Sequence, residues 1–222
     1  NSTISFNLET SLSDKENENT TIAANMYNFR LHTPQQHWEI RHMHIADNTF
    51  EEKRNLIINS DILNGYITGY YNYNTLVNSF TNIIKEHLPT LAGEPSEHSG
   101  NNNFVFGITL KDSELFSTLF DLPINIASSS SISGSCDDKN KRFEIVADLN
   151  DTEFSGRNYR NIAFNTTADN EGLTLNSIMK RPLTDDNNEK AVENDLTIEM
   201  LCSAANDTLY SNFSWDSSAK PV

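Results

Sequence analysis

Residues 25–45 read NMYNFRLHTPQQHWEIRHMHI, and they decide the fold because they hold two strand-like segments around one short turn. In Asn25 to His32 and in His37 to Ile45, apolar and polar side chains alternate as they do in half-buried strands. The four residues between them have the length of a hairpin loop and include the turn-favouring Pro34. The stretch therefore predicts an antiparallel β-hairpin.

The register of this hairpin follows from its four-residue loop, because residues whose numbers sum to 69 then face each other. A slip by one residue would separate the apolar pairs and the Arg–Glu pair at once, so this register is favoured. The predicted pairs are Phe29 with Ile40, Leu31 with Trp38, Tyr27 with His42, Arg30 with Glu39, Asn28 with Arg41, and His32 with His37.

Helical patterns occur beside the strand patterns. Asn74 is a plausible N-cap for a helix whose apolar stripe has the spacing i, i+4, i+7, i+8 and i+11. A second helix is expected to begin at Thr49 and to end before Gly65, and a short one to follow Asp112. The stripe of the first helix consists of Leu76, Phe80, Ile83, Ile84 and His87.

The C-terminal half is expected to be mainly strand, with turn residues at 169–172 and a serine-rich stretch at 128–135. A charged connector is expected at 11–19, after a first strand at Ile4 to Leu8. The predicted fold class is therefore α+β: mainly antiparallel β-sheet with two or three short helices and a strand-rich C-terminal half. Residues 1–222 are expected to form a single domain, with 89–103 as a candidate subdomain boundary.

Charge and hydropathy exclude several classes of partner. The chain has 31 acidic and 16 basic residues, a formal net charge of -15, which repels phosphate backbones and anionic membranes. Nucleic acid is therefore not expected as a partner. Because no apolar run approaches roughly 20 residues and the first residues alternate like a strand, we expect neither membrane insertion nor a targeting peptide.

The chain has two cysteines, Cys136 and Cys202, which are too far apart in sequence for a zinc knuckle or a redox pair. A structural disulfide between them is predicted, which would contribute about 4 kcal/mol in the loop-entropy model. Two unrelated thiols are the alternative. Together with the acidity, the disulfide indicates an extracytoplasmic protein that is secreted, at the cell surface or periplasmic.

Four of the six histidines lie in residues 32–44. Strand alternation is expected to place His42 and His44 on the face of Trp38 and Ile40, with His32 and His37 on the opposite face. One ion therefore cannot bind all four. His42 and His44 form an H-x-H pair that could bind zinc or copper if His87 or an acid joined them, but a strand running out of the core, with tyrosine and asparagine as hydrogen-bond partners, is the favoured interpretation.

A run of tyrosines at 66–73 is a second candidate site. In a strand, Tyr66, Tyr70 and Asn72 share one face and would offer aromatic rings and hydrogen bonds to a glycan or a protein. The alternative is an ordinary strand with one solvated side.

No motif for a catalytic or cofactor site has the spacing that its chemistry requires. We therefore expect a non-enzymatic, acidic binding module, such as an adhesin-type domain, a secreted effector, or an inhibitor of a basic partner. Its partner would be a protein or a glycan, and no cofactor is expected. The alternative is a metal-binding protein or metal-dependent hydrolase that uses His42 and His44.

Overall fold

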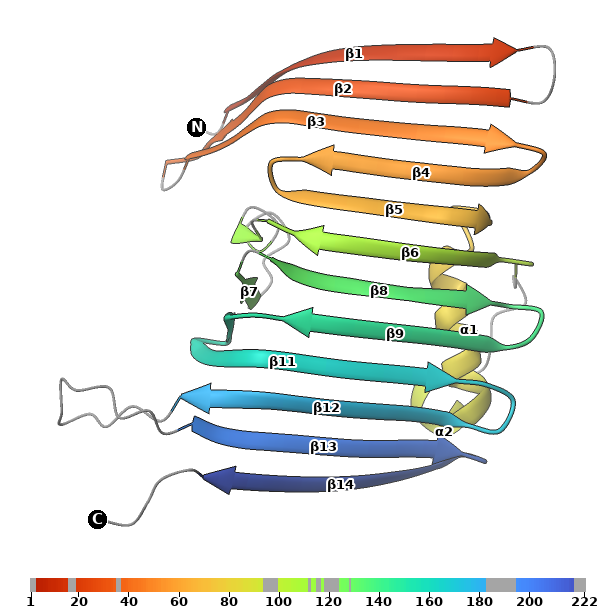
Figure 1. Cartoon of the computed structure of the whole chain (residues 1–222), viewed down its shortest axis with the longest axis vertical. Helices are drawn as coiled ribbons and strands as arrows, with labels where there is room; N and C mark the ends of the chain where they lie inside the picture. Colours follow the sequence, from red (N-terminus) through yellow and green to blue (C-terminus); the bar gives the residue numbers. More distant parts are fainter. Residues whose placement is uncertain are drawn as a thin grey trace, which may run out of the picture.

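The chain folds into one broad antiparallel sheet, crossed on one face by a short helical segment (Figure 1). The computed structural model describes residues 3–15, 19–34, 37–93, 100–111, 113–114, 117, 124–127, 129–182 and 195–217. The strands within these ranges are β1 (Thr3–Lys15), β2 (Asn19–His32), β3 (His37–Phe50), β4 (Lys53–Ser60), β5 (Leu63–Tyr70), β6 (Asn103–Leu110), β7 (Ile124–Ile126), β8 (Ser130–Asp137), β9 (Arg142–Leu149), β10 (Thr152–Phe154), β11 (Arg157–Ala168), β12 (Leu173–Pro182), β13 (Asp195–Ala205) and β14 (Thr208–Ser217). The helices are α1 (Leu76–His87) and α2 (Pro89–Ala92).

The sheet is a meander in which almost every strand pairs with its neighbours in sequence. Its main order is β1-β2-β3-β4-β5-β6-β8-β9-β11-β12-β13-β14, and all pairs are antiparallel. The two short strands β7 and β10 lie off this path and pair with each other, and β10 also pairs with the start of β11. The helices connect β5 to β6, which are adjacent in the sheet.

The two faces of the sheet differ in polarity. The helix face, on which α1 packs, includes one row of opposed residues: Leu12, Ile22, Asp47, Leu56, Ile67, Phe106, Gly134, Ile145, Thr166, Leu175, Cys202 and Ser211. The next row lies on the opposite side, here called the open face: Ser11, Ala23, Ala46, Ile57, Tyr66, Gly107, Ser133, Val146, Asn165, Asn176, Leu201 and Asn212. An antiparallel sheet commonly has one face packed and one face solvated, and the middle of this sheet follows that rule, whereas Leu12 and Ile22 at one end of the helix face are exposed.

The main core lies between α1 and the middle of the sheet. Phe80 of α1 makes edge-on contacts with Phe104, Phe106 and Phe143, at ring-centroid distances of 5.5 to 6.0 Å. Ile83 is 3 % exposed and belongs to the same cluster, with Leu76 and Ile84 packed against it. The helix predicted from the apolar stripe is therefore confirmed.

A buried polar network fixes the start of α1. Asn102 is 2 % exposed, and its side chain accepts a hydrogen bond from the Asn72 amide and donates to the hydroxyls of Thr75 and Ser79. Its backbone amide donates to Asp138, which also accepts a hydrogen bond from Ser79. Because each buried polar group has a partner, the network holds the helix to β6 and to the β8–β9 turn at little desolvation cost.

The predicted register of the hairpin is confirmed, but the alternation along it is interrupted. Five of the six predicted pairs, from Tyr27–His42 to His32–His37, are present, whereas the predicted pair of Asn28 with Arg41 is not formed. In a regular strand, residues three apart lie on opposite faces. However, Ile40 and Met43 pack in one cluster. Asn28 has a left-handed φ of 53°, and the Arg41 amide donates to Asp61, so the strands kink between Ile40 and His42.

The α+β prediction is wrong, because most of the described residues lie in the strands of one large antiparallel sheet and only α1 and α2 are helical. The helix expected from Thr49 is instead the β3–β4 hairpin, in which Glu51 and Glu52 take left-handed φ angles of 46° and 67°. The expected connector at 11–19 is largely strand, as is the serine-rich stretch, which forms most of β8. Most of the helix expected after Asp112 lies outside the described residues.

The predicted disulfide is also not formed, since Cys136 and Cys202 are both free. Cys136 lies on β8 and Cys202 on β13, four strand positions apart, which corresponds to about 19 Å at the usual strand spacing. A disulfide requires Cα atoms within about 7 Å. The acidity and polarity of the chain are then the remaining grounds for placing it outside the cytoplasm.

Candidate functional site

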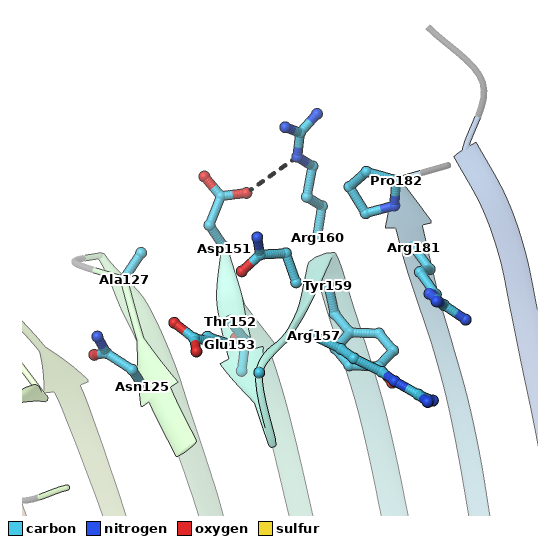
Figure 2. A pocket seen from close by; sticks show the side chains of 12 residues that line it. Asn125, Ala127, Asp151, Thr152, Glu153, Arg157, Tyr159, Arg160, Arg181 and Pro182 are labelled. Atoms are coloured by element: carbon cyan, nitrogen blue, oxygen red, sulfur yellow. Dashed lines mark ion pairs between the residues drawn. The ribbon is translucent and has the colours of Figure 1, made fainter. Parts of the chain in front are cut away.

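A polar pocket of about 620 Å³ lies where the small β7–β10–β11 sheet meets the main sheet (Figure 2). Phe154, Ser155, Gly156 and Arg157 form a tight hairpin between β10 and β11, in which Ser155 and Gly156 have φ of 50° and 75°. Positive φ at both central residues matches the right-handed twist of a two-residue hairpin. The turn reverses the chain, so that the first residues of β11 run antiparallel beside β10.

A bulge in β11 turns this strand from the small sheet into the main one. Its register shifts between Arg160 and Ala163, and Asn161 within the bulge has a φ of 49°. Before the bulge, β11 pairs with β10, and after it with β9. Bulges commonly redirect side chains at the rim of a sheet, and this one leaves Arg160 beside the end of β12.

Three arginines line the pocket: Arg157 and Arg160 from β11, and Arg181 from the end of β12. In Figure 2 the side chains of Arg157 and Tyr159 extend towards the end of β12, where Arg181 lies. Arg160 pairs with Asp151 at 3.6 Å, and both side chains are more than half exposed, so this ion pair is weak. Arg157 and Arg181 have no hydrogen-bond or ion-pair partner among the residues that the structure describes.

Acceptors and amides project from the other side of the small sheet. Glu153 of β10 lies directly between Asn125 of β7 and Asn158 of β11 in the register, so these three side chains share one side, whereas Arg157 and Tyr159 project from the opposite side (Figure 2). With Asp151 and the three arginines, the pocket carries three positive and two negative side chains. Its formal charge is thus +1 in a chain whose net charge is -15.

Sequence reasoning missed this pocket because its arginines come from two strands and a bulge. A signal was present: Arg157, Arg160, Lys180 and Arg181 are four of the 16 basic residues and fall within one 25-residue stretch. What the sequence did not reveal is that β11 and β12 pair so that Arg160 faces Lys180.

Another arginine, Arg54, is held by an ion pair and an aromatic ring, although its buried Nε atom has no hydrogen-bond partner among the described residues. Arg54 pairs with Asp47 on the helix face and lies over the Tyr73 ring at 4.3 Å. Burial lowers the pKa of Arg54, but the hydrogen bond and charge of Asp47 raise it more, so the net pKa is raised. Burial first, and then hydrogen bonds with Tyr71 and Asp47, raise the pKa of Tyr73. This cluster joins β3 and β4 to the β5–α1 connection and has a structural role.

The predicted metal ligands His42 and His44 lie on the open face, away from Trp38 and Ile40. The kink interrupts the alternation along β3. His44 pairs with Asn25 and Asn59, and the side chains of these pairs lie on the open face. The Nδ1 atom of His44 is 2.7 Å from the Asn25 amide oxygen, and the ring of His42 lies 5.2 Å from that of Tyr27. The expected position on the inner face is therefore wrong.

The other histidines do not join this pair. His32 and His37 face each other across the hairpin turn with ring centroids 5.9 Å apart. His87 ends α1, where Nε2 donates to the Asp169 carbonyl oxygen at 2.7 Å, in the β11–β12 turn. Within the described ranges, no three His, Cys, Asp or Glu side chains are grouped as metal ligands.

The tyrosine prediction is partly reproduced in the geometry. Tyr66, Thr68 and Tyr70 share the open face of β5, whereas Asn72 lies beyond the end of the strand. Tyr66 lies against Gly107 on β6, where an added Cβ would come within 2.6 Å of the ring. A shallow hollow of about 400 Å³ surrounds Tyr66, lined by three isoleucines, two glycines and the polar residues Asn59, Asn64, Thr109, Ser131 and Ser133.

None of the helices in the described ranges is long and apolar enough to span a membrane. Comparison with family models, curated proteins and solved structures finds no match to this chain. The candidate sites are therefore argued from their own geometry.

Proposed function

We propose that this protein is a non-enzymatic binding module, acting outside the cytoplasm, that binds an anionic ligand in the arginine-lined pocket of Figure 2. One observation carries the proposal: Arg157 and Arg181 line one pocket, and neither has a partner among the described residues. A guanidinium binds carboxylate, sulfate and phosphate groups through paired hydrogen bonds. The proposed location rests on the acidity and polarity of the chain.

The size and shape of the pocket support binding of a small molecule or of a group on a larger one. Its volume of about 620 Å³ lies within the range of about 300–1,000 Å³ that is usual for ligand pockets. The site is built on paired strands and a tight turn, which fix the backbone positions from which its side chains project.

The test is titration of the purified chain with four anions, acetate, glucuronate, sulfate and phosphate, at constant ionic strength. We expect at least one of them to cause saturable chemical-shift changes at residues 151–160 and 181, and the variant Arg157→Gln/Arg181→Gln to lose this binding. Arg142→Gln is the matched control, because Arg142 is exposed and lies outside this pocket. If no anion binds saturably, or if the double variant binds as the wild type does, the proposal is wrong.

A second candidate function, glycan binding on the open face, is favoured by the position of Tyr66. Its ring lies over Gly107, and amide and hydroxyl side chains line the hollow beside it. A glycan array with neutral oligosaccharides tests this candidate. Binding should be lost in Tyr66→Ala and kept in Tyr210→Ala, since Tyr210 is exposed at the far edge on β14. Absence of binding by the wild type would remove this candidate.

A further inference from the structure

The two edges of the sheet, β1 and β14, are open to a further strand. They lie at opposite ends of the strand order, and each pairs with a single strand among the residues that the structure describes. Their arrows point in opposite directions in Figure 1. The outward N–H and C=O groups of an edge strand form a template for pairing, which proteins commonly block with proline, lysine or a bulge. β14 contains neither residue, and its register with β13 has no shift.

Each edge strand also carries an exposed apolar row on the helix face. All ten residues of β14 are exposed, and three alternate residues on the side of Ser211 are large and apolar. The same is true along β1, because the extra residue that shifts the β1–β2 register lies in β2, at Asn28. The two rows consist of Leu209, Phe213 and Trp215 on β14, and of Ile4, Phe6, Leu8 and Leu12 on β1.

One antiparallel register between β14 and β1 of a second copy brings these rows together. When the residue numbers of each pair sum to 221, the ten residues of β14 face residues 4–13, all within β1. A shift by two residues, the smallest that keeps the faces matched, places Ser211 against Leu8 or Leu12. The helix-face pairs in the matching register are Leu209 with Leu12, Ser211 with Thr10, Phe213 with Leu8, Trp215 with Phe6, and, at the end, Ser217 with Ile4.

The same register keeps charged side chains apart. Each of the two paired segments contains one charged residue, Asp216 in β14 and Glu9 in β1. Asp216 faces Ser5 and Glu9 faces Asn212, so no like charges are opposed. The net charge of -15 on each copy still opposes their approach. We therefore expect monomers in dilute solution at low salt and stronger association when salt screens this repulsion.

Pairing of an edge strand with the same strand of a second copy fits less well. Every antiparallel β14–β14 register that matches the faces leaves at least one of Leu209, Phe213 and Trp215 without an apolar partner. Every such β1–β1 register does the same to at least one of its own apolar residues, Phe6, Leu8 or Leu12. The β14–β1 pair matches all six of these side chains.

We propose that copies of this chain associate head to tail, with β14 of one copy pairing with β1 of the next. The two sheets then form one continuous antiparallel sheet with its apolar rows on one face. Each added copy leaves one free edge, so the contact does not end at a dimer, as a two-fold interface would. The contact involves no residue of the arginine pocket and is therefore independent of the ligand proposed for it.

Sedimentation velocity of the purified chain, over a range of protein concentrations at low and high sodium chloride, tests the association. We expect monomers in dilute solution at low salt, and species larger than dimers that increase with protein concentration and with salt. A chain that stays monomeric at the highest concentration and salt would show that no second copy pairs with these edges. Association that stops at a dimer would also contradict the proposal.

A charge in the middle of the apolar row should prevent the contact. Phe213→Lys should weaken association at least tenfold, because the lysine would face Leu8 of the next copy. Val77→Lys is the matched control, since Val77 is exposed on α1, and it should associate as the wild type does. Circular dichroism shows whether both variants are folded. Equal association of Phe213→Lys and the wild type would overturn the proposal.

Disulfide cross-linking tests the register in a Cys202→Ser background. Asn212→Cys in one preparation and Glu9→Cys in another should form a mixed disulfide on oxidation, because directly opposed residues have Cβ atoms about 4.5–5.5 Å apart. Asn212→Cys with Ser13→Cys is the control, since Ser13 lies four residues from Glu9 on the same face, and it should not cross-link. If Asn212→Cys alone forms a disulfide-linked dimer, the contact is two-fold and the head-to-tail proposal is wrong.

Discussion

The centre and the ends of the helix face have the same alternating sequence pattern but very different environments. At the centre, under α1, Phe104 is 3 % exposed, and its row of opposed residues continues through Cys136 and Phe143 to Leu209 on β14. At the ends, Leu12 of β1 is 72 % exposed and Trp215 of β14 is 73 % exposed. Position along the sheet, and not residue type, decides which apolar side chains are buried.

The length of the helix explains the difference. A helix of 12 residues is about 18 Å long, and neighbouring strands are about 4.8 Å apart, so α1 covers only about four strands of a much wider sheet. Figure 1 shows α1 and α2 crossing the middle and lower strands, with β1 to β4 beyond them. The stability of the fold should therefore depend mainly on the centre.

The largest effect is expected at Phe104. Phe104→Ala should lower the free energy of unfolding by about 3–5 kcal/mol, because it leaves a cavity among the rings under α1. The neighbouring Val105 projects from the open face and is 47 % exposed, so Val105→Ala should cost less than about 1 kcal/mol. Urea unfolding of both variants measures the difference. Equal losses would show that α1 does not define the core.

The second effect concerns the polar anchor of α1. Asn102→Ala should lower the free energy of unfolding by about 1–3 kcal/mol, because three hydrogen-bonding partners, among them the buried Ser79, lose their bond to the side chain. Asn103→Ala is the control, since Asn103 is the exposed first residue of β6. If urea unfolding finds the two variants equally stable, the network does not hold the helix in place.

A smaller effect is expected at the end of the sheet. Trp215→Ala should change the free energy of unfolding by about 0.5 kcal/mol or less, as for an ordinary surface residue. Trp38, the other tryptophan of the chain, is 9 % exposed in the cluster beneath the hairpin, and Trp38→Ala should cost about 3 kcal/mol. Thermal unfolding followed by circular dichroism compares the two variants. A large loss in Trp215→Ala would mean that a partner or second copy covers β14.

No effect on stability is expected from a reducing agent, because the two thiols are not joined. Burial, and then the charges of Asp138 and Asp137, raise the pKa of Cys136 to about 12, so its thiol stays protonated and unreactive at pH 8. Iodoacetamide should label Cys202 alone in the native protein and both cysteines in denaturant, as counted by mass spectrometry. If the melting temperature instead falls on reduction, the result would show that the two cysteines form the predicted disulfide.

The sequence predicted those features that depend on local pattern and neighbouring strands. The turn length and the matched pairs determined the register of the 25–45 hairpin, and the apolar stripe determined α1. The helix expected from Thr49 failed because two glutamates in left-handed turn geometry, followed by β-branched Ile57 and Ile58, form a hairpin instead. The conformation of this turn decided between a helix and a hairpin, and residue identity does not specify that conformation.

By itself, then, the sequence determined an acidic chain of alternating segments and the local pairings within its hairpins. The tertiary structure alone decided which apolar rows α1 covers, that Cys136 and Cys202 lie four strand positions apart, and that Arg157, Arg160 and Arg181 line one pocket. The physical reason is that alternation fixes a side chain's face relative to its neighbours in a strand. Which strands become adjacent, and where a bulge redirects one of them, depends on contacts between residues far apart in the chain.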